Sequence, residues 1–476
     1  MDDRSEDYQL TPLIIPRSQH PISRKMIDEE ALKVLYRLHR HGFLAYLVGG
    51  SVRDLLLGRV PKDFDVATNA HPHEINALFK NSRIIGRRFR LVHVFFKGGK
   101  IIDVSTFRSK SEFEEVNPVR NSSPSTQKIS TGGALNPSRI IAKSNPAAEQ
   151  QGIISNGVKT EEGDIIRTDS FGTPAEDAFR RDITINGLFY NIADFSIIDY
   201  IGGMVDIERR IIRTIGDPDE RFRQDPVRMI RVIRHAARTG FSIEDKTYEA
   251  ISRYREEIRK CSPSRVRDEF LKDLKEGVTR PSFSLMLQTG LLLSVFPDLV
   301  RVFGDRNPWK NRDQQFFLSL FSLVDQLIKM ARPVSESILL ALFLTPFLRA
   351  ITPQHPFLEK KEKYLYLIQT IRWAVHQILT PFSFPRGTKE TAYQILVAQS
   401  NIKKALQKGV ISKRLRMKKY FKEAALLFGI EAQAKGEETP RILQNAAPPD
   451  LLPWWPKRLK KRYRRSGLRN VPQNGT

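Results

Sequence analysis

Apolar positions repeat at helical spacing over residues 27–40, IDEEALKVLYRLHR, and acidic residues fill the first turn. This pattern predicts an amphipathic helix. The next run, AYLVGG, predicts a buried strand that ends in glycine, and SVRDLLLG predicts a short helix closed by Gly58. DFDVAT then predicts a second strand, and HEINALFK predicts another helix. Residues 25–115 are therefore expected to form a unit in which helices alternate with a small sheet.

Two further patterns extend this sheet. RLVHVFF and KIIDVSTF predict a hairpin around Gly98-Gly99, and TPAEDAFRRDITINGLFYNIADFSIIDYIGG predicts a helix followed by strands. Between them, residues 114–170 contain much Ser, Asn, Pro and Gly and show neither the helical nor the strand period. This composition predicts a long mobile insertion.

From about Asp225 onward the pattern is helical, as in PVRMIRVIRHAARTGF and KYLYLIQTIRWAVHQIL. The predicted fold class is therefore α+β, with a small head that holds a mixed sheet and helices, followed by an all-helical neck and body and a basic tail. The expected boundaries are a leader at 1–25, the head at 26–200, the neck at 201–275, the body at 276–400 and a basic C-terminal region at 401–476.

Charge adds a class of partner to this picture. The 476 residues include 78 Lys and Arg against 53 Asp and Glu, so the formal net charge is +25. Such an excess favours binding to a polyanion. Nine basic residues and no acid lie between Lys403 and Lys422, and eight more lie in KRLKKRYRRSGLR, which follows Trp454-Trp455. Each cluster alone is also compatible with a solvated surface, but together they favour contact with a nucleic acid backbone.

Other features of the composition place the protein in a broad class. The single cysteine, Cys261, excludes an internal disulfide and a cysteine zinc cluster. The N-terminus is polar and acidic rather than like a signal peptide, and the most apolar run, from Ser337 to Leu348, is shorter than the roughly 20 residues that span a bilayer. We therefore expect a cytoplasmic protein without a transmembrane segment.

The stretch LVGGSVRDLLLGRVPKDFDVATNA contains the strongest candidate chemistry. Asp63 and Asp65 should project to the same side of a strand, with Cα atoms about 7 Å apart, while Phe64 faces the other way. Such close carboxylates repel each other unless a cation lies between them, and Mg²⁺ prefers oxygen ligands. Gly49-Gly50 could let backbone N–H groups approach a phosphate. A glycine pair alone is usually a turn and an Asp-x-Asp alone is usually surface, but together they indicate metal-assisted nucleotidyl transfer.

Nucleotidyl transfer that uses two metal ions requires a third carboxylate beside Asp63 and Asp65. Asp103 in KIIDVSTF is the best candidate, although a strand-end aspartate with no function is also compatible with the pattern. Arginines at helical spacing form a second feature, a stripe on one predicted helix made of Arg228, Arg231, Arg234 and Arg238. We interpret it as facing nucleotide phosphate or RNA rather than as a solvated face.

At this level of detail the sequence resembles a known family. VGGSVRDLLLGRVPKDFDVATNA resembles the signature of the DNA polymerase β-like nucleotidyltransferases, in the branch that contains class II tRNA nucleotidyltransferases and bacterial poly(A) polymerases. RRDITINGLFY, DYIGGMVDI and DPVRMIRVIRHAARTGF continue the resemblance, which covers roughly residues 15–300. It implies a nucleotidyltransferase head and a neck that binds nucleotide and RNA.

The resemblance also assigns residues. It implies that Asp63 and Asp65 ligate metal, with Asp103 as the expected third catalytic carboxylate. The residues that it implies for the nucleotide are Gly49, Gly50, Ser51 and Arg53 at the triphosphate, Arg181 and Asp182 at the sugar, and Asp225 and Arg228 at the base. Gln224 stands where the family's Glu-Asp-x-x-Arg element has Glu, so its contact with Arg228 cannot be an ion pair.

The leader IIPRSQHPISRKMIDEEALKVLYRLHRHGF and the run IIGRRFRLVHVFF resemble bacterial poly(A) polymerase I more than CCA-adding enzymes. In that run, Arg87, Arg88 and Arg90 would bind RNA or triphosphate, and a charged strand edge that discourages aggregation is the alternative. The tail residues Lys457, Arg458, Lys460, Lys461 and Arg462 are the other expected RNA contacts, since phosphate contacts carry no sequence information.

The sequence thus predicts a template-independent poly(A) polymerase that uses ATP and two Mg²⁺ ions, with Mn²⁺ as a substitute. Its expected partners are RNA 3′ ends, largely regardless of sequence, and it is expected to be a monomer. A CCA-adding or A-adding tRNA nucleotidyltransferase remains the alternative in the same class. A non-catalytic RNA-binding protein on the same scaffold is the alternative in another class.

Overall fold

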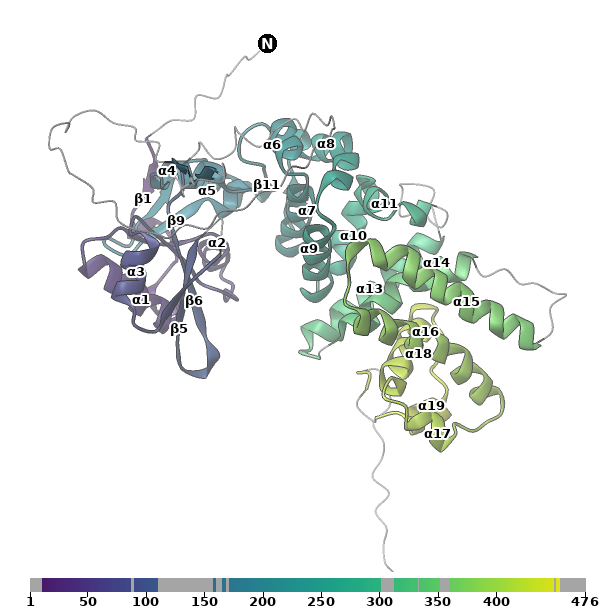
Figure 1. The fold of residues 1–476 in the computed structure, drawn as a ribbon. Coiled ribbons are helices and arrows are strands. Elements are labelled where there is room, and N and C mark those ends of the chain that lie inside the picture. The colour runs from purple at the N-terminus through teal and green to yellow at the C-terminus, as the bar shows by residue number, and fades with distance from the viewer. Residues whose placement is uncertain are drawn as a thin grey trace, which may run out of the picture. The chain divides into compact units, whose positions relative to one another are not determined.

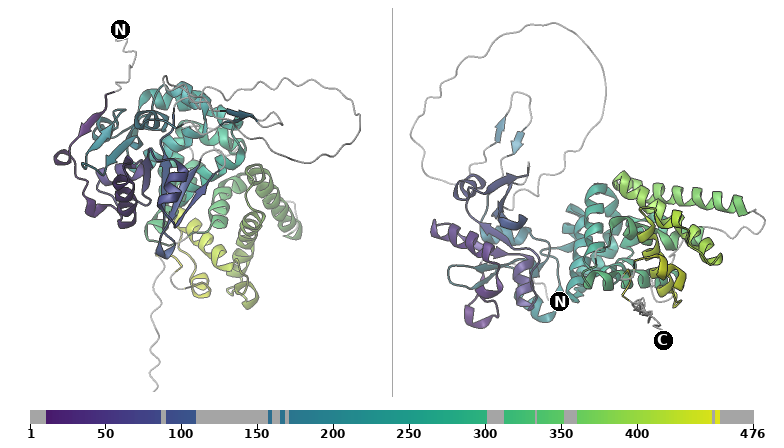
Figure 2. Two further views of the ribbon diagram at one scale, coloured as in Figure 1. Left: turned by 60° about the vertical axis from the view of Figure 1, so that its left-hand side comes forward. Right: turned by 90° about the horizontal axis from the view of Figure 1, so that it is seen from below.

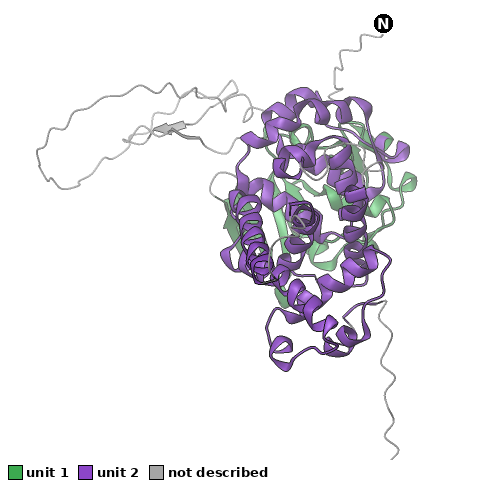
Figure 3. Ribbon diagram, turned by 90° about the vertical axis from the view of Figure 1, so that its right-hand side faces the viewer, with its two compact units in different colours: residues 1–205 green, residues 206–476 purple. Residues whose placement is uncertain are grey.

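A computed structural model describes residues 11–86, 90–109, 157–159, 165–167, 171–300, 312–332, 334–351, 360–448 and 451–453. The chain divides into two compact units, residues 1–205 and residues 206–476, which Figure 3 colours separately. The first unit contains the sheet, and the second consists mainly of helices (Figures 1 and 2). The predicted α+β class, with a mixed sheet followed by a helical region, is confirmed.

Eight of the described strands form one mixed sheet in the first unit, in the order β1-β10-β9-β2-β3-β6-β5-β4. Only β3 and β6 are parallel neighbours within it, and their register sets Asp65 opposite Asp103. The strands are β1 (Leu13–Ile15), β2 (Ala45–Val48), β3 (Asp65–Thr68), β4 (Ser82–Ile85), β5 (Leu91–Phe95), β6 (Ile101–Thr106), β9 (Leu188–Asn191) and β10 (Ile197–Asp199). A separate antiparallel pair joins β7 (Gly157–Lys159) to β8 (Ile165–Arg167).

The helices of this unit follow the predicted pattern closely. Helix α1 (Glu29–Arg40) begins after Asp28, whose carboxylate accepts the backbone N–H groups of Glu30 and Ala31, and it packs on β2 and β3. Helix α2 (Gly50–Leu56) packs on β2 and β9, and α3 (Pro72–Leu78) packs on β4 and β5. Helix α4 (Pro174–Arg180) begins at a capping box. The predicted hairpin around Gly98-Gly99 is confirmed, because β5 and β6 pair antiparallel.

Two details differ from the sequence prediction. Asp63 precedes the strand, which begins only at Asp65, so the two aspartates are not both in the ladder. Residues Leu13–Ile15 of the expected leader form β1 and pair with β10, which places them in the sheet itself. Short edge strands carry little periodic signal, and β1 is only three residues long.

The second unit is built from helices whose apolar faces pack together. Phenylalanines dominate this core: Phe270 and Phe283 stack with ring centroids 5.8 Å apart, and Phe283 stacks on Phe317 at 5.2 Å. The helices are α6 (Pro218–Gln224), α7 (Val227–Thr239), α8 (Asp245–Tyr254), α9 (Pro263–Lys275), α10 (Thr279–Gln288), α11 (Leu291–Val295), α13 (Arg312–Lys329), α14 (Glu336–Ile351), α15 (Lys360–Leu379), α16 (Arg386–Gln407), α17 (Lys413–Arg416), α18 (Phe421–Ala434) and α19 (Arg441–Ala446).

Three further elements are short. Helix α5 (Gly203–Arg209) spans the division between the units, and β11 (Ile211–Ile212) pairs with β12 (Ser242–Ile243). Among the described helices, none is both long enough and apolar enough to cross a membrane. Most of the predicted insertion, and the basic run from Lys457 to Arg469, lie outside the described residues.

Candidate active site

A pair of carboxylates at the centre of the sheet forms the core of the site. Asp65 and Asp103 are register partners on the parallel strands β3 and β6, so their side chains project from the same face. Asp65 is exposed to solvent as a residue, yet the protein groups packed around its carboxylate desolvate it. This desolvation and the nearby charge of Asp103 raise the pKa of Asp65 to about 6, and Asp63 contributes to the same shift. The three predicted carboxylates are therefore electrostatic neighbours.

Arg181 is the cation that faces this group. Its charge opposes the rise in the pKa of Asp65. The guanidinium is held by Asp177, whose Oδ2 lies 3.0 Å from Nη2, and it donates from Nη1 to the carbonyl of Asn186 at 3.2 Å. It also lies 5.3 Å from the centroid of the Phe189 ring. Arg181 is thus fixed on three sides and directed at the carboxylates, while the adjacent Asp182 is half-buried.

The glycine pair lies against the same groups. Gly49 has a positive φ of 75°, and a Cβ atom there would lie 3.1 Å from Nη1 of Arg181 and 3.9 Å from Oδ2 of Asp65. A side chain at position 49 would therefore enter the space between Arg181 and Asp65. The hydroxyl of Ser51 is buried and donates to the carbonyl of Val48 at 2.9 Å, which fixes the start of α2.

Arg53 supports this loop from inside the unit. Its side chain is only 1% exposed. Its guanidinium donates from Nε and Nη2 to Oδ1 of Asp54 at 2.9 and 2.8 Å, and from Nη1 to Oδ1 of Asn186 at 2.7 Å. A Cβ atom at Gly50 would lie 3.4 Å from Nη2. Sequence reasoning missed Asn186, which links Arg53 to the segment that carries Arg181, because only the fold brings these segments together.

The donor set matches the chemistry of a hard divalent cation. Among the described residues, no three His, Cys, Asp or Glu side chains already converge closely enough to hold a metal ion. The donors at the site are nevertheless carboxylate oxygens, and the repulsion that raises the pKa of Asp65 is what a bound cation relieves. Asp63, Asp65 and Asp103 therefore fit Mg²⁺ by donor chemistry.

The second unit holds the predicted pair Asp225 and Arg228. Asp225 ends α6, and Oδ2 lies 3.9 Å from Nε of Arg228, which is buried at the start of α7. Arg265, from α9, also reaches Oδ2 of Asp225, at 2.9 Å, and no signal in the sequence pointed to it. Gln224 is exposed.

The arginines of the predicted stripe on α7 differ in burial and in their contacts. Arg231 and Arg238 are half-buried, but the side chain of Arg234 is only 7% exposed. It pairs with Glu269 and lies 3.6 Å from Oδ1 of Asp273, both on α9. The prediction that the whole stripe faces phosphate or RNA is therefore wrong for Arg234, because spacing along one helix does not reveal acids on its neighbour.

The predicted RNA contacts are mostly beyond the described part of the chain. Arg90 is described and exposed, whereas Arg87 and Arg88 lie outside the described residues. The tail residues Lys457, Arg458, Lys460, Lys461 and Arg462 lie outside them as well.

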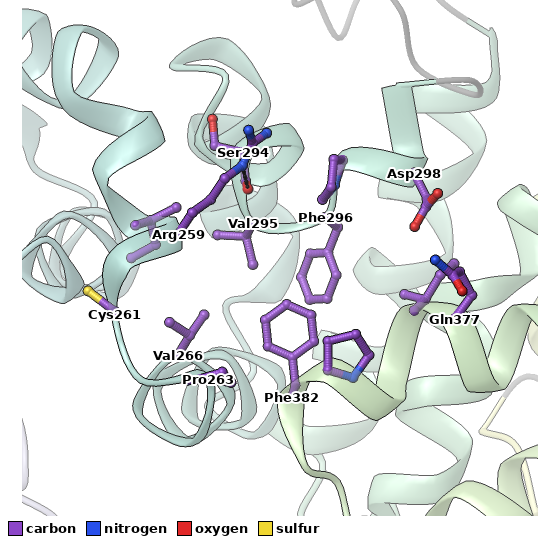
Figure 4. Close-up of a pocket in the computed structure, with 14 residues that line it drawn as sticks. Arg259, Cys261, Pro263, Val266, Ser294, Val295, Phe296, Asp298, Gln377 and Phe382 are labelled. Atoms are coloured by element: carbon purple, nitrogen blue, oxygen red, sulfur yellow. Dashed lines mark hydrogen bonds between the residues drawn. The ribbon is translucent and has the colours of Figure 1, made fainter. Parts of the chain in front are cut away.

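A separate cavity of about 320 Å³ lies within the second unit (Figure 4). Its wall is mainly apolar, and the rings of Phe296 and Phe382 have their centroids 4.9 Å apart. Arg259 lies at this wall with Nε donating to the carbonyl of Ser294 at 3.1 Å. Burial raises the pKa of the Cys261 thiol, so this cysteine is not an activated nucleophile.

Comparison with known proteins finds matches in both units. Residues 45–213 match the family described as the poly A polymerase head domain, and residues 240–302 match one described as a probable RNA and SrmB-binding site of polymerase A. The poly(A) polymerase I of Salmonella typhi is 43% identical over 292 residues, which cover 61% of this chain and 55% of that protein. The CCA-adding enzyme of Lactobacillus helveticus is 32% identical over 282 residues, 57% of this chain and 59% of that protein.

A solved structure has the same fold. The Bacillus stearothermophilus CCA-adding enzyme in complex with CTP superposes with a TM-score of 0.57 at 23% identity, over 88% of this chain and 81% of that one. These matches confirm the resemblance indicated by the motifs. The chain spans little more than half the length of the curated relatives it matches.

Proposed function

We propose, from the match of residues 45–213 to the poly A polymerase head domain family, that the protein is a template-independent poly(A) polymerase. It adds AMP from ATP to RNA 3′ ends. In each step the 3′-oxygen of RNA forms a bond to the α-phosphorus of ATP, the α–β phosphoanhydride bond breaks, and pyrophosphate and the hydroxyl proton leave. The higher identity to a poly(A) polymerase I than to a CCA-adding enzyme supports this product.

In this proposal, Asp63, Asp65 and Asp103 form the catalytic group. Two Mg²⁺ ions, or Mn²⁺ in their place, would be held by these carboxylates and would lower the pKa of the 3′-hydroxyl and neutralise charge on the triphosphate. The observation that carries the proposal is the register of Asp65 and Asp103 on parallel strands beside Arg181. It gives the face of the sheet two carboxylates whose backbone positions the register fixes, together with one fixed cation, so positioning and electrostatics supply the catalysis.

The same residues can receive ATP. Gly49 leaves open the space between Arg181 and Asp65, and we assign this space to the triphosphate and sugar, with Gly50, Ser51, Arg53 and Asp182 supporting it. Since Arg53 is buried and bound to Asp54 and Asn186, its proposed role is to support the loop from below. Asp225 and Arg228 are proposed to contact the adenine base through hydrogen bonds.

RNA is proposed to bind largely through its backbone. Arg87, Arg88 and Arg90 in the head and the tail residues Lys457, Arg458, Lys460, Lys461 and Arg462 are the proposed contacts. Residues 201–275 are the proposed neck, 276–400 the body and 401–476 a basic RNA-binding region, after a leader at 1–25 and a head at 26–200. The match of residues 240–302 to an RNA-binding family supports contact with RNA in the second unit.

Nucleotide-by-nucleotide extension tests the proposal. The full chain is incubated with Mg²⁺, a generic oligoribonucleotide and each NTP singly, and the products are resolved by length. Long tails with ATP alone, and no comparable tails with CTP, GTP or UTP, support a poly(A) polymerase. Growth only on a tRNA that lacks its CCA end, with CTP and ATP, would identify a CCA-adding enzyme instead.

A non-catalytic RNA-binding protein is the candidate from another class. It would bind RNA in a salt-dependent manner, as the polymerase would, so RNA affinity does not separate the two. Mg²⁺-dependent ATP binding does, since a pure RNA-binding protein should show none. The desolvated Asp65 beside Asp103 argues against that class, because such a pair destabilises a protein that gains nothing from it.

A further inference from the structure

His93 lies beside the catalytic group and has no role in the proposed reaction. On β5 it is the register partner of Asp103, and Asp103 in turn is the register partner of Asp65. Register partners on adjacent strands project from the same face of a sheet. His93, Asp103 and Asp65 therefore form a single row across β5, β6 and β3, which we call the site row.

The contact within this row is close. Nε2 of His93 lies 3.3 Å from Oδ1 of Asp103. The side chain of His93 is 26% exposed and that of Asp103 is 49% exposed. Asp103 is thus the more open of the two, and His93 stands on the side away from Asp65. The imidazole is itself packed against Phe95, whose ring meets it edge to face with centroids 6.1 Å apart.

The two carboxylates of the row therefore have different neighbours. Asp65 lies beside Arg181, which is fixed by Asp177 and by the carbonyl of Asn186. The neighbour of Asp103 is His93. The strand register fixes the backbone positions of Asp65 and Asp103. An aspartate that is half exposed on a strand can still rotate about χ1 and χ2, and a polar group beside it restricts that rotation.

We propose that His93 is a positioning residue that holds the Asp103 carboxylate in the orientation needed to bind metal next to Asp65. The inference rests on the proposed function, because it takes Asp103 as a metal ligand. Residues that orient a metal-binding carboxylate typically change metal affinity or activity by about 10- to 100-fold when they are replaced. His93 acts through Asp103 and does not itself touch the substrate.

Amide replacements test this geometry, because they place a nitrogen at different distances from the backbone. Gln extends its amide nitrogen about as far as Nε2 of histidine, whereas Asn extends it only about as far as Nδ1. His93→Gln should therefore preserve the contact with Asp103, and His93→Asn and His93→Leu should lose it. Ile101→Ala is the matched control, since Ile101 lies two residues from Asp103 on the same face of β6 and is 44% exposed.

The first readout is metal binding without turnover. Mn²⁺ is titrated into the full chain in the presence of α,β-methylene-ATP, and free Mn²⁺ is measured by electron paramagnetic resonance. His93→Asn and His93→Leu should weaken binding by about 10-fold, while His93→Gln and Ile101→Ala stay within about threefold of the unmodified protein. Unchanged binding by His93→Asn and His93→Leu overturns the inference alone, because the metal site itself is then intact. An unmodified protein that binds no Mn²⁺ overturns the proposed function together with it.

The second readout separates positioning from folding. For RNA extension, kcat should fall in His93→Asn with KM for RNA unchanged, and His93→Gln should recover most of it. Thermal unfolding midpoints of the variants should agree with that of the unmodified protein within a few degrees. Equal losses of kcat in His93→Gln and His93→Leu, with lowered unfolding midpoints in both, would show a purely structural residue and overturn the inference.

Discussion

Each unit of the molecule contains a cluster of carboxylates, and the two clusters balance their charge differently. In the head, Asp65 and Asp103 face the same side of the sheet with some access to solvent, and the nearest fixed cation, Arg181, only partly offsets their repulsion. In the helical unit, Glu269 and Asp273 are buried against Arg234, whose side chain is also buried.

The two buried carboxyl groups of the helical cluster have pKa values shifted in opposite directions. It would raise the pKa of Glu269, but Arg234 and Lys272 bring that pKa below its usual value. For Asp273, which is fully buried, the same effect prevails over Arg234 and raises the pKa to about 7. The negative charge of this cluster is therefore offset within the protein. The guanidinium of Arg234 pairs with Glu269, and the raised pKa of Asp273 favours its protonated form. The head pair leaves negative charge to be balanced from outside the chain, which distinguishes a functional cluster from a structural one.

Removing a charge from the head pair should give the largest effect on activity and almost none on folding. Asp65→Asn is expected to lower the rate of ATP-dependent RNA extension by at least about 10³-fold, because the carboxylate is part of the catalytic group. Its unfolding midpoint should be unchanged or higher, since the repulsion from Asp103 is removed. Extension assays and thermal unfolding, with the exposed Glu29→Gln as control, measure both. An active Asp65→Asn protein would refute the catalytic assignment.

Removing the cation of the helical cluster should give the opposite pattern. Arg234→Ala leaves Glu269 buried without its guanidinium partner, so the free energy of unfolding should fall by about 3 to 5 kcal/mol. Urea unfolding of the full chain measures this change. Lys403→Ala removes an exposed charge and should stay within about 0.5 kcal/mol of the unmodified protein. If Arg234→Ala were as stable as this control, the cluster would not be balanced by Arg234.

The raised pKa of Asp273 makes a smaller, pH-dependent prediction. The folded state keeps a proton on Asp273 up to about pH 7, whereas the unfolded chain releases it near pH 4. Stability should therefore fall as pH rises from about 4 to 7, by at most about 1.4 kcal/mol per pH unit from this group. Asp273→Asn removes that contribution. The unfolding free energies of the two proteins should be similar near pH 4 and diverge as pH rises, with Asp273→Asn the more stable protein at pH 7, and parallel curves would contradict the assignment.

Much of the head follows from local sequence signals. The amphipathic spacing of α1, the glycines that flank α2 and Gly98-Gly99 in the hairpin all act within a few residues, so the pattern predicts these elements and the approximate position of Asp65 and Asp103. The start of β3 at Asp65 instead of Asp63 depends on pairing with β2 and β6, which local pattern does not encode.

The remaining features depend on contacts between distant segments. Arg53 reads as a phosphate ligand in sequence, but Asn186, 133 positions away, gives it a buried partner. The sequence places Arg234 in a stripe that would face phosphate or RNA, but its side chain is buried and pairs with Glu269 on α9. His93 is one of several residues in a predicted strand until the register places it beside Asp103. In each case the missing information is a contact between segments that are far apart in the sequence.

The parallel register of β3 and β6 also determines which kinds of sequence change the site can survive. Because the backbone ladder sets the spacing of Asp65 and Asp103, substitutions elsewhere on these strands leave that spacing intact. A one-residue insertion or deletion between Ile101 and Asp103 would shift the alternation of β6 and bring Val104 or Ile102 to the face that now carries the carboxylate. The site thus tolerates variation in residue identity but not in strand length, and its functional descendants should differ by replacement and not by gaps in this segment.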